Sequence, residues 1–320
     1  MGKGKIPGAL QKVSTQLSKR SKIDGIGITM TAELSDVFES KFEGVKYILE
    51  IVEKKWSNIN PLVMDNTGHL ISINEACKNY LRVSSANWAA TSEVLAKIFQ
   101  NCILIDTGST TTDIIPIINH KVAVSGRTDT DRLSTGELVY TGILRSSIPS
   151  IVHSIRVKGK ETGIASEIFA LTADVHFLLG NISQEEYSTE TADSRGTSRE
   201  ECLSRLARTV CADTDLLGEP ELIRMAYYIY NKQVEKIGDG LKLVWKRLLI
   251  EEKLKLNFPI ITTGLGGRIL GRDAASKQGF RRFFDMGSIL GIKDPQAVPA
   301  VSTALLVAEN KGEKLVWPTY

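Results

Sequence analysis

The sequence predicts an α/β protein of two lobes, and three observations predict it. The chain has 320 residues, which favours two domains or one large two-lobed domain. Short β-branched runs alternate with stretches of helical spacing. Glycine-containing turns at 106–113 and 262–267 each follow an apolar run. We expect residues 1–100 to belong to the first lobe and 101–296 to the second, with a final helix over 297–309 that packs back on the first.

The first hundred residues are predicted to alternate between helix and strand. Apolar residues between 41 and 55 recur three or four positions apart, which is the spacing of one helix face. The turn Asn66-Thr67-Gly68 separates two short apolar runs, as a turn between paired strands does. Helices are therefore expected over 7–20 and 41–55 and within 75–99, and strands over 23–30, 61–64 and 70–73.

Residues 102–118 read CILIDTGSTTTDIIPII and predict two strands joined by a polar turn. The glycine permits a tight backbone turn, and the four hydroxyl residues after it offer hydroxyls and N–H groups that converge as they do around a phosphate. An ordinary hairpin with a threonine-rich turn is the alternative, although hairpin turns are more often Asn-Gly or Asp-Gly. The predicted phosphate-binding residues of this turn are Gly108, Ser109, Thr110, Thr111 and Thr112.

Two acids frame this turn. Asp106 ends the first strand and Asp113 begins the second, so both carboxylates border the space where a phosphate would lie. Carboxylates in such a position hold Mg²⁺ or polarise a water molecule. We expect both acids to be catalytic, Asp106 to be a metal ligand, and Mg²⁺ to be the cofactor.

Beyond these strands the chain is predicted to be mainly helical. A return strand is expected over 122–124, a polar segment over 127–142, and helix through most of 165–257, with 222–252 almost unbroken. An apolar run at 259–262 then leads into a glycine-rich turn and a helix. N–H groups at such a helix start favour an anion, although any strand-to-helix turn can need a glycine. The predicted phosphate-binding residues here are Gly264, Gly266, Gly267 and Arg268.

One further acid is predicted to be catalytic. Glu137 follows Asp129 and Asp131 in a segment that contains more polar residues than its turns need. An acid surplus of this kind is typical of a catalytic or metal-binding segment. A purely structural role for Glu137 is equally compatible with the sequence.

The substrate pocket is predicted from scattered polar residues, each with a plainer alternative. Glu33 is either a cleft residue or a solvated loop acid. Asn87 precedes Trp88, a residue type more often found in a core. Asp174 follows an apolar stretch, so the alternative for it is a buried acid or a helix cap. Arg195 either clamps a phosphate or forms a surface ion pair.

Composition and charge narrow the class of protein. A net charge of +3, from 40 basic and 37 acidic residues, predicts no general attraction to nucleic acid or to an anionic membrane. No apolar run reaches the roughly 18 residues that a membrane-spanning helix needs. The four cysteines form no Cys-x-x-Cys pair, which fits a reducing compartment. We expect a cytoplasmic enzyme that acts on small molecules, with a homodimer as a compatible assembly.

The motifs together resemble a known family. The segments DTGSTTTDI (106–114) and TTGLGG (262–267) are similar to the second phosphate loop and the adenosine-side loop of the superfamily of actin, Hsp70 and sugar kinases, and within it to the hydantoinase/oxoprolinase branch. Longer segments are similar to proteins of tetrahydromethanopterin-linked one-carbon transfer. They are TMTAELSDVF (29–38), EGV (43–45), SANW (85–88), IDTGSTTTDIIPI (105–117), TDTDRLSTGELVYTG (128–142), TADV (172–175) and TADSRG (191–196).

The resemblance implies a fold and a reaction. The fold would be that of a two-lobed actin-like ATPase, which is ribonuclease H-like, with the ligand in an interlobe cleft. The reaction would be a step of methanofuran biosynthesis, in which a transferase moves an aminomethyl-furanmethyl group from its diphosphate to the phenol oxygen of γ-glutamyltyramine. The alternatives are an ATP-dependent amidohydrolase of the hydantoinase/oxoprolinase kind and a non-catalytic protein that binds a nucleotide or phosphate.

One part of the family pattern is missing from the sequence. Members of the family begin with a strand that carries an Asp-Ile-Gly-Gly type of first phosphate loop, and no such motif precedes Ile23. We therefore expect Met1 to be an internal start and the first lobe to be truncated at its N-terminus. In-frame DNA upstream of Met1 that encodes the loop would support this expectation.

Overall fold

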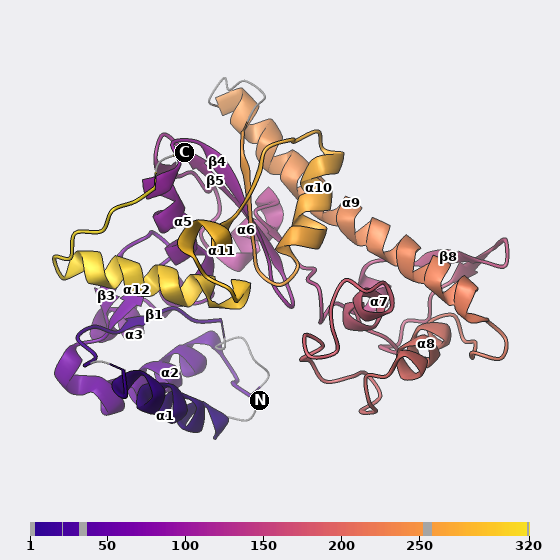
Figure 1. Cartoon of the computed structure of the whole chain (residues 1–320), viewed down its shortest axis with the longest axis horizontal. Coiled ribbons are helices and arrows are strands. Elements are labelled where there is room, and N and C mark those ends of the chain that lie inside the picture. The colour runs from indigo at the N-terminus through magenta and orange to yellow at the C-terminus, as the bar shows by residue number, and fades with distance from the viewer. Residues whose placement is uncertain (1–3, 21, 32–36, 252–257, 319) are drawn as a thin grey trace. The chain divides into compact units, whose positions relative to one another are not determined.

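Helices and short strands alternate through the part of the chain that the computed structural model describes (Figure 1), which comprises residues 4–20, 22–31, 37–251, 258–318 and 320. The chain divides into two units. Unit 1 comprises residues 1–102, 115–132 and 297–320, and unit 2 comprises 103–114 and 133–296. Residues 115–132 therefore lie with unit 1, although they follow the boundary expected near residue 100.

Unit 1 has a sheet of three short strands in the order β1-β2-β3, with β1 parallel and β3 antiparallel to β2. Helix α2 packs the buried side chains Val45, Leu49 and Val52 against this part of the core. The elements are α1 (Lys5–Ser18), β1 (Gly27–Ile28), α2 (Lys41–Trp56), β2 (Leu62–Met64), β3 (Leu70–Ser72), α3 (Ile73–Lys78), α4 (Tyr80–Val83), α5 (Asn87–Ile98), β6 (Lys121–Val122) and α12 (Val298–Asn310).

The strand predicted over 23–30 is much shorter in the structure, where only Gly27 and Ile28 form β1. Helix α12 passes so close to this segment that a Cβ on Gly27 would lie 2.6 Å from Thr303 Cγ2. The glycine therefore allows the close approach of the helix, which packs on β1 and α5 within unit 1. The predicted helices over 7–20 and 41–55 are confirmed as α1 and α2.

Unit 2 is built on a mixed sheet in which β11, β10, β4 and β5 are successive neighbours. Strand β10 runs parallel to β4, with Thr263 opposite Asp106, and β11 runs parallel to β10. Every residue of β4 is buried, as in a strand covered on both faces. The elements are β4 (Cys102–Thr107), β5 (Thr112–Ile118), β7 (Leu138–Val139), β8 (Ser154–Val157), β9 (Lys160–Gly163), α7 (Thr172–Leu178), α8 (Arg199–Arg208), α9 (Glu219–Glu251), β10 (Ile260–Thr263), α10 (Arg272–Lys277), β11 (Phe283–Asp285) and α11 (Met286–Leu290).

Strand β5 and helix α6 (Asp129–Thr135) each cross from one unit to the other along the chain. Within unit 2, β5 pairs at its start with β7, where Thr112 lies opposite Val139. Within unit 1, its last residues pair with β6, which is where the return strand was predicted.

The helical region predicted through 165–257 is interrupted. Helix α7 ends where Gly180 adopts a positive φ of 71°, and α8 begins only where Ser198 and Glu201 form a reciprocal capping box. The expected unbroken helix is confirmed as α9, while residues 252–257 lie outside the described part of the chain. The hairpin of β8 and β9 was not predicted, although Lys158 and Gly159 have the positive φ angles typical of its turn.

Helix α9 organises the helical part of unit 2. It packs against α7, α8 and β8 toward one end and against α10 toward the other (Figure 1). No helix within the described ranges is long and apolar enough to cross a membrane.

Candidate functional site

The threonine-rich turn joins β4 to β5 in unit 2, and the backbone behind it holds it in place. The carbonyl of Gly108 accepts a hydrogen bond from the N–H of Ile143 at 3.0 Å. The carbonyl of Ser109 accepts from Leu144 at 3.0 Å and from Arg145 at 2.9 Å. The side of the turn that carries these carbonyls is therefore fixed against residues 143–145.

The N–H groups of the same turn are differently placed. Those of Ser109, Thr110 and Thr111 donate to no acceptor among the residues that the structure describes. All three residues are only partly buried, and each adds a side-chain hydroxyl. Three successive N–H groups that donate to no described residue, in a turn whose Gly108 and Ser109 carbonyls are already bonded, are suited to an anion such as a phosphate.

Gly142 allows the supporting segment to approach this turn. A Cβ at that position would lie 2.5 Å from the backbone nitrogen of Thr110 and 2.7 Å from the carbonyl oxygen of Gly108, so no larger residue fits without a shift. Sequence reasoning missed Gly142 as a site residue. A glycine three residues after a short apolar strand was the available signal, and it is too common to have identified this contact.

The second glycine turn lies beside the first within unit 2. The N–H of Gly266 donates to the carbonyl of Thr107 at 2.9 Å. Gly264 has a φ of 78°, and a Cβ there would lie 2.5 Å from Asp106 Oδ1. The structure thus brings together two turns that are far apart in the sequence, and the Asp106 carboxylate lies where they meet.

Asp106 and Asp113 are both largely buried at the strand ends that flank the first turn. Opposite Asp106, the hydroxyl of Thr263 is buried and has no hydrogen-bond partner in the described part of the chain. Among the described residues, no three His, Cys, Asp or Glu side chains gather closely enough to form a metal site by themselves.

Arg268 follows the second glycine turn but binds Asp285. Its Nε and one terminal nitrogen lie 3.0 and 2.9 Å from the two carboxylate oxygens, although the side chain is 72% exposed. The Arg268 guanidinium lowers the pKa of Asp285, chiefly through these hydrogen bonds. In this structure the pair links the glycine turn to the end of β11, which leaves a phosphate contact from Arg268 as a prediction.

Glu137, predicted to be catalytic, is completely buried. Its carboxylate lies 2.7 Å from a terminal nitrogen of Arg247 on α9 and accepts a hydrogen bond of 3.0 Å from Thr135. In this structure Glu137 links the start of β7 to α9, and a catalytic role for it stays a prediction.

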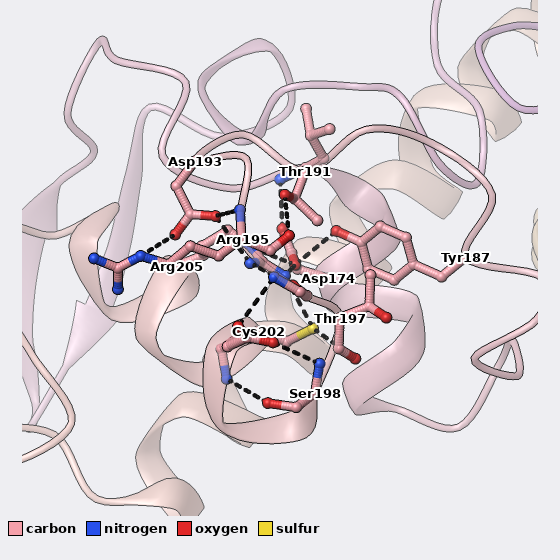
Figure 2. A network of polar contacts seen from close by, with 12 residues as sticks. Asp174, Tyr187, Thr191, Asp193, Arg195, Thr197, Ser198, Cys202 and Arg205 are labelled. Atoms are coloured by element: carbon pink, nitrogen blue, oxygen red, sulfur yellow. Dashed lines mark hydrogen bonds and ion pairs between the residues drawn. The ribbon is translucent and has the colours of Figure 1, made fainter.

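Asp174 was predicted to line the substrate pocket, and the structure places it inside a buried network (Figure 2). Its carboxylate accepts hydrogen bonds from Arg205 Nε at 2.8 Å, from the Tyr187 hydroxyl at 2.8 Å and from the Leu171 N–H at 2.9 Å. Asp174 is thus both the buried acid and the helix cap of the plainer interpretation. Its ion-pair partner Arg205 lies on a separate helix, α8, and a role for Asp174 in the substrate pocket stays a prediction.

The remaining predicted pocket residues are Arg195, Asn87 and Glu33. Arg195 has an exposed side chain 4.0 Å from Asp193 (Figure 2), as in the alternative of a surface ion pair. Asn87 is the first residue of α5 in unit 1, and Trp88 beside it is buried with the Arg132 guanidinium 4.3 Å above its ring. Glu33 lies outside the described residues.

Comparison with known proteins identifies relatives. The model of the hydantoinase/oxoprolinase family matches residues 24–289. The chain is 41% identical over 249 residues to the (4-{4-[2-(γ-L-glutamylamino)ethyl]phenoxymethyl}furan-2-yl)methanamine synthase of Methanocaldococcus jannaschii, covering 78% of this chain and 73% of that protein. It is 34% identical over 225 residues to the synthase of the same name from Methanococcus vannielii, covering 69% of this chain and 97% of that protein.

Two solved structures are also similar in part. One is the nucleotide-free structure of an ATP-dependent acetone carboxylase, with a TM-score of 0.48 and 15% identity over 74% of this chain. The other is an ATP-dependent caprolactamase from Pseudomonas jessenii, with a TM-score of 0.43 and 13% identity over 84% of this chain. This chain spans 35% and 41% of those two longer chains.

Proposed function

Because the chain belongs to the hydantoinase/oxoprolinase family, in which its two named relatives are synthases, we propose that it catalyses the reaction named for those relatives. Their product contains a phenoxymethyl group, so the reaction creates an ether between a phenol oxygen and the methylene carbon of a furan. The chain is then a transferase of methanofuran biosynthesis.

The substrates are the diphosphate of aminomethyl-furanmethanol and γ-glutamyltyramine. The phenol oxygen attacks the furan methylene carbon, and the bond between that carbon and the diphosphate oxygen breaks. The electron pair of the broken bond leaves with diphosphate, while the phenolic proton passes to a base. The enzyme must therefore hold a departing polyanion and accept one proton.

The observation that carries this proposal is the turn at 108–111. Its three N–H groups, which donate to no acceptor in the described part of the chain, can stabilise the charge that develops on diphosphate as the bond breaks. Donors fixed in advance by the packing behind them need no reorganisation during the reaction. The N–H-rich face of this turn suits a leaving group, just as it would suit a nucleotide phosphate in an ATP-dependent relative.

Mg²⁺ is part of the proposal, and Asp106 would hold it. Mg²⁺ is commonly bound by one or two carboxylates together with phosphates of the substrate and water, so a single buried carboxylate beside both turns fits. When bound, Mg²⁺ supplies additional neutralisation of the diphosphate charge.

Asp113 is the base in this proposal. It is the second residue of β5, on the other side of the same turn, and it is largely buried. A carboxylate at this position accepts the phenolic proton as the ether bond forms.

The wider expectations from the resemblance belong to this proposal as well. We propose an actin-like fold, supported by the mixed sheet in which β10 and β11 add parallel strands beside the β4–β5 pair. We also propose that the protein acts on small molecules in the cytoplasm.

The direct test is product formation by the purified full chain. We expect incubation with both substrates and Mg²⁺ to yield the aryl ether by mass spectrometry, with one diphosphate released for each ether formed. Asp113→Asn should lower the rate at least about a hundredfold, as removal of a general base commonly does. Asp215→Asn, which changes an exposed acid of the same unit, is the matched control.

A second incubation with ATP and a cyclic amide examines the alternative amidohydrolase. Release of inorganic phosphate and opening of the amide, without ether formation in the first incubation, would overturn the synthase proposal. Binding of diphosphate without either reaction would favour the non-catalytic alternative.

A further inference from the structure

A series of hydrogen-bonded, buried polar side chains in unit 2 connects helix α7 to Thr141 and Gly142, behind the threonine-rich turn. His176 on α7 and Gln233 on α9 are both completely buried, and the two helices pack together (Figure 1). Buried polar groups are costly unless they are hydrogen-bonded, so the partners of these two side chains are informative.

The hydrogen bonds of Gln233 determine which groups donate and which accept in this series. Its amide nitrogen donates to Gly142 O at 2.7 Å and to Thr141 Oγ1 at 3.0 Å. With both amide protons used, only its oxygen faces His176 Nε2, at 2.9 Å. His176 must therefore donate from Nε2, which leaves Nδ1 as an acceptor for the Asn181 amide at 3.0 Å.

This arrangement needs a neutral imidazole. Burial lowers the pKa of His176 to about 4, so the ring is uncharged at neutral pH. A second ring proton would also point at the Asn181 amide, which is itself a donor. The tautomer and the amide orientation of Gln233 are thus determined together.

The segment that Gln233 contacts, Thr141-Gly142, is held by several other hydrogen bonds. The Gly142 carbonyl also accepts from Thr172 Oγ1 at 3.0 Å, and the Gly142 N–H donates to Ser146 Oγ at 3.0 Å. The carbonyl of Thr141 accepts from Thr112 Oγ1 at 2.9 Å. Thr112 is the first residue after the turn, so the position of Thr141 and Gly142 is coupled to both ends of the site.

A displacement of Thr141 and Gly142 would also displace the threonine-rich turn. Gly142 lies so close to the backbone of the turn that an added Cβ would be 2.5 Å from the Thr110 nitrogen, and the three residues after it donate to the carbonyls of Gly108 and Ser109. These contacts fix the peptide planes of the turn and so the direction of its N–H groups. A loosened Gly142 carbonyl would therefore loosen the anion-binding face.

We propose that His176 and Gln233 are positioning residues for the anion-binding turn, acting through the Gly142 carbonyl. The inference rests on the proposed function in one respect, that this turn binds diphosphate. Neither side chain touches the ligand. Their role is to hold the segment that holds the turn.

Calorimetric binding of inorganic diphosphate with Mg²⁺ tests the proposal, with the full chain kept well below its unfolding temperature. His176→Leu and Gln233→Met should each weaken the Kd about tenfold, the factor that corresponds to about 1.4 kcal/mol. Tyr187→Phe is the matched control, because it also removes a buried hydrogen bond to α7, through Asp174, but has no link to Gly142.

A second pair of variants does not require an apolar replacement in the core. His176→Gln keeps an amide nitrogen able to reach Gln233 and should bind diphosphate nearly as the wild type does. His176→Asn is polar but too short, and it should show the tenfold loss. If His176 had only a structural role, the Kd values of these two variants would not depend on whether the side chain is long enough to contact Gln233.

The outcomes distinguish the positioning role of His176 and Gln233 from the proposed binding of diphosphate. Unchanged Kd values in His176→Leu and Gln233→Met, or an equal loss in Tyr187→Phe, would overturn the positioning role while leaving the diphosphate site intact. If the wild type itself does not bind diphosphate with Mg²⁺, the proposed function fails and the inference fails with it.

Discussion

Replacing Asp174 by asparagine should destabilise the protein strongly without acting on the reaction itself. The substitution keeps the shape of the side chain and removes its charge. It leaves the completely buried Arg205 guanidinium without its main counter-charge, because Nε and a terminal nitrogen of Arg205 lie 2.8 and 2.7 Å from Asp174 Oδ1. This change separates a structural role from the pocket role that the sequence predicted.

The expected loss is about 3 kcal/mol in the free energy of unfolding, the lower end of what breaking a buried ion pair costs. The lower end applies because an asparagine oxygen still accepts hydrogen bonds from Arg205 and Tyr187. Arg205 also keeps a second carboxylate, since its other terminal nitrogen lies 3.1 Å from Asp193. The double variant Asp174→Leu with Arg205→Met should lose less, because no charge is then buried alone.

Urea denaturation of the full chain measures the loss, with hydrogen exchange of the α7 and α8 amides to localise it to this network. Arg199→Ala is the control, because its ion pair with Glu219 has side chains 44% and 50% exposed and should contribute no more than about 1 kcal/mol. The turnover number of the folded Asp174→Asn protein should equal that of the wild type. Unchanged stability combined with lost turnover would refute the structural role and restore Asp174 to the pocket.

Three further outcomes are expected. Asp106→Asn should abolish Mg²⁺-dependent diphosphate binding by calorimetry while the circular dichroism spectrum stays unchanged, and retained binding would remove Asp106 from the site. Gly142→Ala should weaken diphosphate binding at least about tenfold because its Cβ would meet the Thr110 nitrogen, whereas Gly163→Ala, with no atom within 4 Å of its Cβ, should not. Because burial lowers the pKa of His176 from 6.5 to about 4, the unfolded chain takes up a proton between these values that the folded chain does not. The free energy of unfolding should therefore fall by up to about 3 kcal/mol between pH 6.5 and 4, and His176→Gln should remove this part of the slope. An identical slope in the two proteins by urea denaturation would contradict the assignment.

Features that depend on neighbouring residues were predictable from the sequence. The helical spacing of Val45, Leu49 and Val52 predicted α2, because one face of a helix packs on whatever core is present. The turn at 108–111 was predictable because its glycine and hydroxyl residues are consecutive. The β8–β9 hairpin was missed even though its turn residues are local, since Lys158-Gly159 is a weaker turn signal than Asn-Gly.

Features that depend on distant partners were not predictable. Glu137 was predicted to be a site residue because its segment contains more polar residues than its turns need, and Asp174 because an acid after an apolar stretch is unusual. Each is explained by one arginine on another helix, Arg247 for the first and Arg205 for the second. No local pattern reveals which arginine will pair with which acid, so burial with a partner and exposure to a substrate look alike in the sequence.

The same reasoning explains why the anion site needs more than its own motif. A glycine and hydroxyl-rich turn alone could close its N–H groups onto its own carbonyls, and it would then offer nothing to a phosphate. Here the carbonyls of Gly108 and Ser109 are already bonded to residues 143–145, which leaves the N–H groups for a ligand. Those residues in turn follow Gly142, whose carbonyl is held by the buried amide of Gln233. The binding capacity of the turn therefore depends on the helices behind it, and substitution of His176 in α7 or Gln233 in α9 should alter the affinity for diphosphate although neither residue belongs to the turn.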